Sequence, residues 1–210
     1  MKRRHAFFYV IARFLVIIFA KIRFGYQFKI AKNLPDNYIV ISNHATDYDV
    51  LFVAASFRRM MYIVGSSHIG RWGIVSKLLE YCFAPIMRYK GASAASAVKE
   101  MAKKAKKGAN VCLFAEGVRT WDGITCPIAP STAKLIKSMG CGLVTYKITG
   151  GYFVSPMWAG ATVRKGSLHG APVSILTKEQ LQGMSNDEIY ELLKNAGYDF
   201  KQKTNHIKVR

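Results

Sequence analysis

The residues with the clearest chemical potential are a histidine and an aspartate five positions apart, His44 and Asp49, in the stretch SNHATDYDV. An apolar run rich in β-branched residues ends at Ser42, and a helical pattern begins a few residues later. A turn of this kind lets the aspartate fold back onto one imidazole nitrogen, which leaves the other free to take a proton. Such a pair suits a general base acting on a hydroxyl group. The alternative is that Asp49 or Asp47 caps the helix and that His44 is incidental.

A second polar cluster follows another apolar run, in LFAEGVRTWDG at 113–123. Gly117 permits a sharp turn or a close approach of the backbone to a ligand. Arg119 and exposed backbone N–H groups are able to hold a phosphate. Glu116 is expected either to orient Arg119 or to hydrogen-bond a substrate hydroxyl. A plain surface turn with a salt bridge is the alternative interpretation of this cluster.

Short apolar runs alternate with helical patterns along the rest of the chain. Strands are expected at Tyr38–Ser42, Met61–Gly65, Ala84–Arg88, Asn110–Ala115 and Gly142–Ile148. Helices are expected at Asp49–Arg58, Gly73–Tyr81, Ala92–Lys107, Pro130–Ser138 and Asp187–Asn195, the last of them capped by Ser185. The alternation predicts an α/β fold with a mostly parallel central sheet flanked by helices. At 210 residues, 50% of them apolar, the chain is long enough for one such domain.

Polar side chains stand at the carboxyl ends of three of the expected strands. Asn43 and His44 follow the first, Arg88 ends the third, and Glu116 follows the fourth. In open parallel sheets, the groups that bind ligands gather at this edge. The pattern therefore predicts that a histidine, an arginine and a glutamate share one site.

The net charge of +19 calls for an anionic partner, which is a nucleic acid, an anionic lipid or a phosphorylated substrate. The basic residues are unevenly placed: residues 1–32 hold eight lysines or arginines and no acid, and further runs lie at 99–107 and 201–210. Nucleic acid is disfavoured, because the most basic region is also the most apolar and no nucleic-acid-binding motif is present.

The segment AFFYVIARFLVIIFAKI, at 6–22, is strongly apolar. It is shorter than the ~20 uninterrupted apolar residues of a bilayer span, Arg13 interrupts it, and no signal-peptide cleavage site follows it. At helical spacing one stripe forms, with Arg13 on the opposite side; its members are Phe7, Ile11, Phe14, Ile18 and Ile22. We expect a helix lying in the membrane interface, whose basic residues reach anionic headgroups. An ordinary core helix and a true span are the alternatives.

The four cysteines form no CxxC pair, and most of their neighbours are apolar. We interpret them as reduced, mostly buried thiols of a cytosol-facing protein, and we expect no metal site. The chain also lacks the GxSxG motif of serine nucleophiles.

Taken together and in this order, the two polar clusters resemble the motifs of the PlsC-type lysophosphatidic acid acyltransferase family of glycerolipid synthesis. That family carries NHxxxxD after its first strand, here NHATDYD at 43–49, and an FPEGTRS-like motif later, here FAEGVRT at 114–120. A segment ending in arginine lies between them, here APIMR at 84–88. Most of the chain shares the resemblance, although the proline and threonine of the second motif are replaced by Ala115 and Val118.

The resemblance implies that His44, oriented by Asp49, takes the proton of a glycerol hydroxyl, whose oxygen attacks the thioester of acyl-CoA or of an acyl carrier protein. It also implies a set of residues that bind the phosphate and polar head of the acceptor, 1-acyl-glycerol 3-phosphate: Arg88, Glu116, Gly117, Arg119 and Thr120. The product would be phosphatidic acid, with no cofactor and no metal. The implied organisation is a membrane-interface helical region at 1–30 and an acyltransferase domain at 31–210, on the cytoplasmic face of the cell membrane.

Two other functions stay open at this point. The altered second motif is compatible with a different acceptor, which is another lysophospholipid or glycerol 3-phosphate. A function of a different class is that of a non-catalytic basic protein bound to a membrane surface, which the intact His44, Asp49, Glu116 and Arg119 disfavour.

Overall fold

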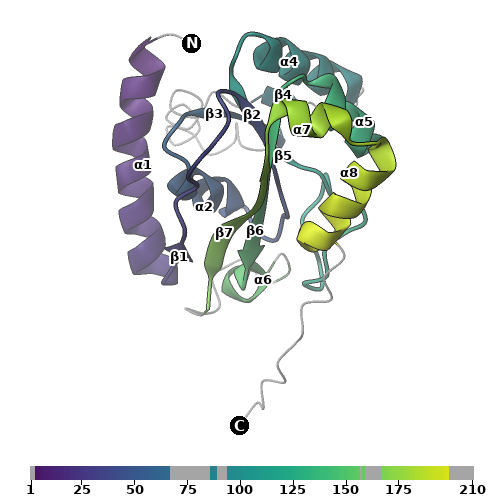
Figure 1. The fold of residues 1–210 in the computed structure, drawn as a ribbon. Helices are drawn as coiled ribbons and strands as arrows, with labels where there is room; N and C mark the ends of the chain where they lie inside the picture. The colour runs from purple at the N-terminus through teal and green to yellow at the C-terminus, as the bar shows by residue number, and fades with distance from the viewer. Residues whose placement is uncertain (1–2, 67–85, 89–93, 157, 159–166, 199–210) are drawn as a thin grey trace.

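A computed structural model describes residues 3–66, 86–88, 94–156, 158 and 167–198, and within them seven strands form one sheet (Figure 1). In sheet order the strands are β1 (Gln27–Phe28), β7 (His169–Leu176), β6 (Gly142–Thr149), β2 (Tyr38–Ser42), β5 (Asn110–Phe114), β3 (Met61–Ser66) and β4 (Ile86–Arg88). Only the β6–β7 pair is antiparallel among these strands. The mostly parallel sheet expected from the sequence is therefore confirmed.

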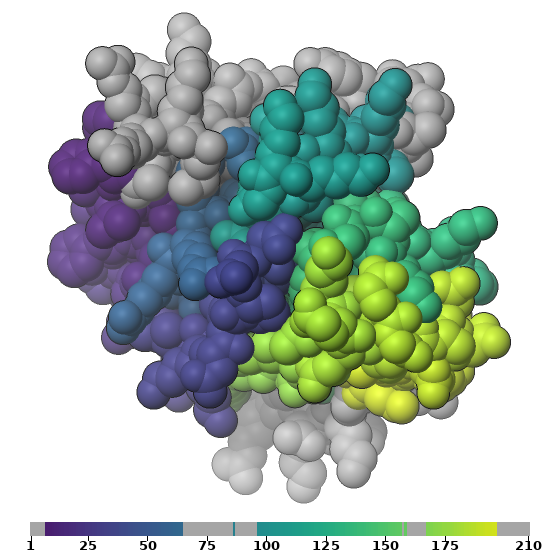
Figure 2. All heavy atoms as spheres, turned by 45° about the horizontal axis from the view of Figure 1, so that its top comes forward, coloured from purple at the N-terminus to yellow at the C-terminus, as the bar shows by residue number. Residues whose placement is uncertain are grey.

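Helices cover both faces of the sheet. They are α1 (Arg3–Phe24), α2 (Asp49–Ser56), α4 (Ala94–Lys106), α5 (Ser131–Ser138), α6 (Gly151–Val154), α7 (Lys178–Gly183) and α8 (Asn186–Leu193), followed by the π-helical turn Lys194–Tyr198. Strand β2 shows why two layers form, because Tyr38 and Val40 face a core with α1 and α2, while Ile39 and Ile41 face a second core with α4, α5, α7 and α8. As a result α1 and α8 lie on opposite flanks of the molecule (Figures 1 and 2).

All five expected strands are present. Four of the five expected helices are present and shorter than expected, although α8 begins one residue before the expected start. The fifth helix, Gly73–Tyr81, lies outside the described residues, as does Cys82. Ser185 caps α8 through a reciprocal pair of bonds with Glu188. Cys112 and Cys141 are buried free thiols, and Cys126 is a partly exposed one.

The sequence patterns missed β1 and β7, which form the edge of the sheet next to β6. Pro172 has no backbone N–H to donate to a neighbouring strand, and Gly170 has no side chain to pack. The first half of β7 therefore does not have the composition typical of a strand. The glycine is required by its surroundings, because a Cβ there would lie 1.9 Å from the hydroxyl oxygen of Tyr26. Gln27 and Phe28 of β1 extend the sheet beyond β7.

The apolar stripe expected on the first helix is exposed along the outer side of α1. Every member of the stripe is exposed, and the side chains of Phe14 and Ile22 are 63% and 69% exposed. The opposite side of α1 packs into the core through Tyr9, Ala20 and Phe24. Among the described residues, no helix combines the length and apolar character needed to cross a bilayer.

Arg13 does not reach outward from α1, which corrects the expectation that it contacts headgroups. Its guanidinium donates to the carbonyl oxygen of Ala55 in the last turn of α2, and the hydroxyl of Tyr9 lies 3.0 Å from the carbonyl oxygen of Phe57 just beyond. The last carbonyls of a helix have no partner within the helix and carry partial negative charge, so a cation is favoured there. Arg13 therefore joins α1 to α2.

Candidate active site

His44 and Asp49 form the side-chain pair that their spacing predicted. His44 Nδ1 lies 2.9 Å from Asp49 Oδ2, and the imidazole ring stacks on Phe114 at the end of β5. Asp49 is fully buried, whereas the His44 side chain is 20% exposed. A carboxylate only accepts hydrogen bonds, so the proton of the neutral ring sits on Nδ1. No described residue bonds to Nε2, which is left as the nitrogen able to accept a proton.

Asp49 is held by the turn that precedes it. Its Oδ2 accepts the backbone N–H groups of Ala45, at 2.6 Å, and Thr46, at 2.8 Å, and its Oδ1 accepts the Thr46 hydroxyl. The N-cap position of α2 belongs to Tyr48, whose side chain makes no capping bond. The alternative that Asp49 or Asp47 caps this helix is therefore wrong: the Asp49 carboxylate organises the turn and orients the imidazole.

Asn43 attaches this turn to the sheet, a role that sequence reasoning did not assign to it. Its side-chain nitrogen donates to the carbonyl oxygen of Ile148 at 2.9 Å, and its side-chain oxygen accepts the N–H of Ile148 at 2.8 Å. This pair of hydrogen bonds to β6 holds the end of β2 at the point where the chain leaves the sheet. The signals in the sequence were its position directly after a strand and its place as the first residue of the NHxxxxD motif.

Glu116 binds backbone rather than Arg119, which corrects one expectation. Its Oε1 accepts the N–H of His44 and its Oε2 accepts the N–H of Cys126, both at 2.8 Å. Burial raises the pKa of Glu116 to about 7, while those two bonds and the nearby imidazole oppose the rise. With both oxygens engaged, Glu116 is a brace between the His44 turn and the segment that leads to α5.

Arg119 pairs with Asp47, three residues after His44. Nη1 lies 2.8 Å from Asp47 Oδ2, and both side chains are partly exposed, at 28% and 51%. The sequence had suggested Glu116 as the partner; the structure places Asp47 there because the loop after β5 lies across the His44 turn. The N–H of Thr120, next to Arg119, donates to the carbonyl oxygen of His44 at 3.1 Å. The cation is thereby fixed beside the catalytic candidate.

The loop from Gly117 onward turns tightly on itself. Gly117 has φ of 70°, the left-handed conformation expected of a glycine at this turn. The buried hydroxyl of Thr120 donates to the carbonyl oxygen of Ile124 and accepts the N–H of Gly123. The Thr120 hydroxyl therefore helps to hold the loop in shape, and the binding of substrate by Thr120 stays a prediction.

The remaining expected site residue is Arg88. Its backbone ends β4, paired with β3, and its side chain lies outside what the structure describes. Four of the described positions, His44, Asp49, Glu116 and Arg119, are joined by the contacts given above. Within the described ranges, no group of three or more metal-ligating side chains comes together.

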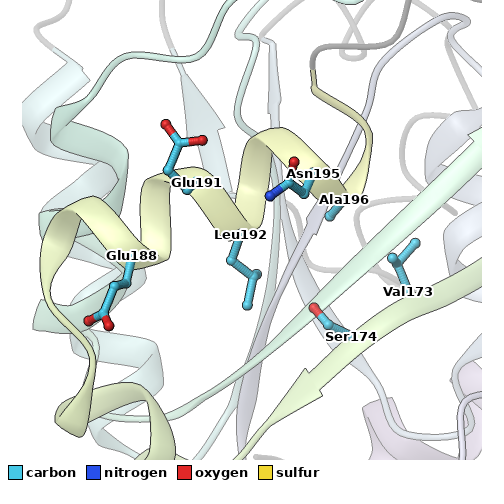
Figure 3. Close-up of a pocket in the computed structure, with 7 residues that line it drawn as sticks. All are labelled: Val173, Ser174, Glu188, Glu191, Leu192, Asn195 and Ala196. Atoms are coloured by element: carbon cyan, nitrogen blue, oxygen red, sulfur yellow. The ribbon is translucent and has the colours of Figure 1, made fainter.

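A separate hollow of about 480 Å³ lies between β7 and α8 (Figure 3). Its walls include Val173 and Leu192, together with two acids, Glu188 and Glu191. Glu188 is engaged in the cap of α8, and Glu191 pairs with Lys194. None of the residues gathered around His44 lines this hollow.

Both a protein family and a solved structure are similar to this chain. The family model described as Acyltransferase matches residues 26–149, a range that contains both polar clusters. Among solved structures, the fold is similar to the crystal structure of the 1-acyl-sn-glycerophosphate acyltransferase PlsC from Thermotoga maritima, with a TM-score of 0.68 and 17% sequence identity. The similarity covers 92% of this chain and 75% of that chain. No curated protein sequence matches.

Proposed function

The chain belongs to the acyltransferase family, and from that premise we propose that it acylates the free hydroxyl of 1-acyl-glycerol 3-phosphate to give phosphatidic acid. The donor in this proposal is acyl-CoA or an acyl carrier protein. The observation that carries the proposal is the junction at His44, whose ring is held by Asp49 and whose peptide is bonded to the loop bearing Arg119. The junction supports a site in which His44 is the base and Arg119, next to Thr120 in the chain, is the cation.

In the proposed reaction, His44 Nε2 takes the proton of the acceptor hydroxyl as its oxygen bonds to the thioester carbonyl carbon. The carbon–sulfur bond then breaks, and the departing thiolate receives the proton from the imidazolium. Asp49 stabilises that imidazolium through Nδ1, at 2.9 Å, without itself taking the proton. No acyl-enzyme is required, since the acceptor oxygen attacks the donor directly.

The acceptor phosphate is proposed to bind Arg119. The guanidinium is partly exposed and uses one nitrogen for Asp47, which leaves further N–H groups for a phosphate. The PlsC from Thermotoga maritima, whose fold is similar, is a 1-acyl-sn-glycerophosphate acyltransferase. A phosphate-bearing acceptor is consistent with both observations, and glycerol 3-phosphate or another lysophospholipid remains the alternative to be tested.

We further propose that the outer side of α1 lies in the interface of an anionic membrane, on its cytoplasmic side. Nine large apolar side chains of α1, from Phe7 to Ile22, are at least 40% exposed. Lys21 and Arg23, also exposed, stand at the end of the helix. A helix with an uncovered apolar face and flanking cations favours an anionic bilayer surface.

The test is an assay of the full chain against several acceptors. Lysophosphatidic acid, two other lysophospholipids and glycerol 3-phosphate would each be offered with long-chain acyl-CoA and with acyl carrier protein, and products read by mass spectrometry. We expect phosphatidic acid from the first acceptor. His44→Ala should lower kcat by at least roughly 100-fold, the contribution of a general base. Its matched control is His169→Ala, an exposed histidine on β7.

Three results would go against the proposal. Substantial turnover by His44→Ala would refute the role of the imidazole. Faster acylation of another acceptor would replace lysophosphatidic acid as the substrate. The absence of turnover with every pair, in a folded protein that binds vesicles, would support the non-catalytic alternative.

A further inference from the structure

The loop between β5 and α5 exposes large apolar side chains around Arg119. Val118 is 58% exposed, Trp121 is 60% exposed, and Ile124 is 48% exposed. Single exposed apolar residues are ordinary on a protein surface, but three within seven residues, one of them a tryptophan, are not. None of the three is used in the site contacts around His44.

A second segment brings another tryptophan to the same loop. The ring of Tyr152, in α6, lies against Gly123, where an added Cβ would be 3.0 Å from the ring. The hydroxyl of Tyr152 accepts the indole N–H of Trp158 at 2.9 Å, and Trp158 is itself 57% exposed. Trp158 is therefore linked through Tyr152 to the loop that carries Trp121. We call the four exposed apolar residues of these two segments the rim cluster: Val118, Trp121, Ile124 and Trp158.

The loop that carries the rim cluster is braced from within. Asp122 Oδ1 accepts the N–H of Ile124 at 3.0 Å. The Thr120 hydroxyl donates to the carbonyl oxygen of Ile124 and accepts the N–H of Gly123. Of the two acids in this region, Asp47 pairs with Arg119, and Asp122 uses Oδ1 within the loop while its side chain stays exposed. A loop whose backbone is already fixed by these bonds loses less conformational freedom on binding.

We propose that the rim cluster inserts into the surface of an anionic phospholipid bilayer, as a second membrane contact besides α1. This inference rests on the proposed function, because a lipid acceptor must pass from a bilayer to His44. Tryptophan and aliphatic side chains beside an arginine suit the headgroup boundary, where apolar bodies are buried and polar ends stay wet. The net charge of +19 favours an anionic surface. A contact at the loop that carries Arg119 would bring the lipid surface to the site.

The first experiment measures where Trp121 lies when the full chain is bound to vesicles. A variant with Trp72→Phe and Trp158→Phe leaves Trp121 as the one indole. With phosphatidylglycerol vesicles, we expect its emission to shift to shorter wavelength and to be quenched by lipids brominated in their acyl chains. Unchanged emission from protein that sediments with the vesicles would overturn the inference. A shift caused by acyl carrier protein in place of vesicles would also overturn it, in favour of donor docking.

The second experiment uses Trp121→Ser, with Val173→Ser as the matched control, because Val173 is a 51% exposed apolar residue on β7. For an acceptor embedded in vesicles, Trp121→Ser should raise KM by roughly tenfold, as expected for one lost apolar anchor. For a short-chain acceptor dissolved as monomers, KM and kcat should stay as in the wild type. An equal loss with both acceptors would mean a structural role for Trp121 and would overturn the inference.

The two arms separate failure of this inference from failure of the proposed function. The fluorescence arm needs no turnover. If no acceptor is acylated but Trp121 is quenched by brominated lipid, the membrane contact stands and the proposed reaction is wrong.

Discussion

His44 and Glu116 are joined through the backbone, with the N–H of His44 2.8 Å from Glu116 Oε1. Seventy-two residues separate them in sequence, and each follows a strand of the sheet. The same loop returns to His44 at Thr120, whose N–H donates to the His44 carbonyl oxygen. The peptide units on both sides of His44 are thus held by the loop that also carries Arg119.

Glu116→Gln should loosen the His44 turn. Glu116 uses two acceptor oxygens, whereas glutamine has one acceptor oxygen and one NH₂ group. The NH₂ group would therefore face the backbone N–H of His44 or that of Cys126, and this N–H would lose its acceptor. At pH 4.5, where the contribution of Glu116 is fully present, we expect a fall of about 1–3 kcal/mol in the free energy of unfolding, the usual cost of an unsatisfied polar group shielded from water. Denaturant unfolding measures it. The control is Glu179→Gln, in the exposed first turn of α7. Equal stability of the two variants would contradict the role of Glu116 in holding the His44 turn.

The stability contributed by Glu116 should depend on pH. Its pKa is raised in the folded protein to about 7 from an ordinary value of 4.5, so the folded state binds the proton more tightly than the unfolded state. This contribution is fully present below pH 4.5 and is lost as the pH rises through about 7. Because glutamine does not titrate, the unfolding free energy of the wild type minus that of Glu116→Gln should decline across this window. A difference that stays constant or grows with pH would contradict the raised pKa.

Arg119 and Asp47 should affect acceptor binding in opposite directions. Arg119→Ala removes the proposed phosphate ligand and should raise KM for the acceptor, leaving KM for the donor unchanged. Asp47→Asn removes a carboxylate that competes with phosphate for the guanidinium, and should lower acceptor KM by up to about fivefold, the worth of an exposed ion pair. Initial-rate kinetics with each substrate varied in turn would measure both. A change confined to donor KM in either variant would show that Arg119 does not hold the phosphate.

Substitutions on the exposed side of α1 should affect membrane binding, and substitutions on its buried side should affect stability. Phe14→Ser combined with Ile22→Ser removes exposed apolar area and should weaken vesicle binding, with little change in the free energy of unfolding. Tyr9→Phe should do the reverse, because it removes the buried hydroxyl that bonds to the end of α2 and costs about 1 kcal/mol. Vesicle sedimentation and denaturant unfolding of both variants are the measurements. If the Phe14 and Ile22 double variant binds vesicles as the wild type does, α1 is not the membrane contact.

Several features could be derived from the sequence because they depend on contacts within one or two turns of chain. His44 and Asp49 are five residues apart across a strand-to-helix turn, and their contact follows from that spacing. Ser185 and Glu188 cap α8 for the same reason. The alternating runs predicted the five strands around the site, and helical spacing predicted the exposed stripe of α1. The division into regions 1–30 and 31–210 stays a prediction.

Only the tertiary structure decided which distant groups meet. The register of β2 beside β5 and β6 brings Glu116 to the His44 N–H, Arg119 to Asp47 and Asn43 to Ile148. Arg13 faces α2 because the free carbonyls at the end of that helix lie beneath α1. The helical spacing of residues in α1 does not predict which helix packs against it. The physical reason is general: covalent geometry limits partners only a few residues apart to a few arrangements. A carboxylate or a guanidinium binds any suitable group that strand pairing and helix packing bring within reach.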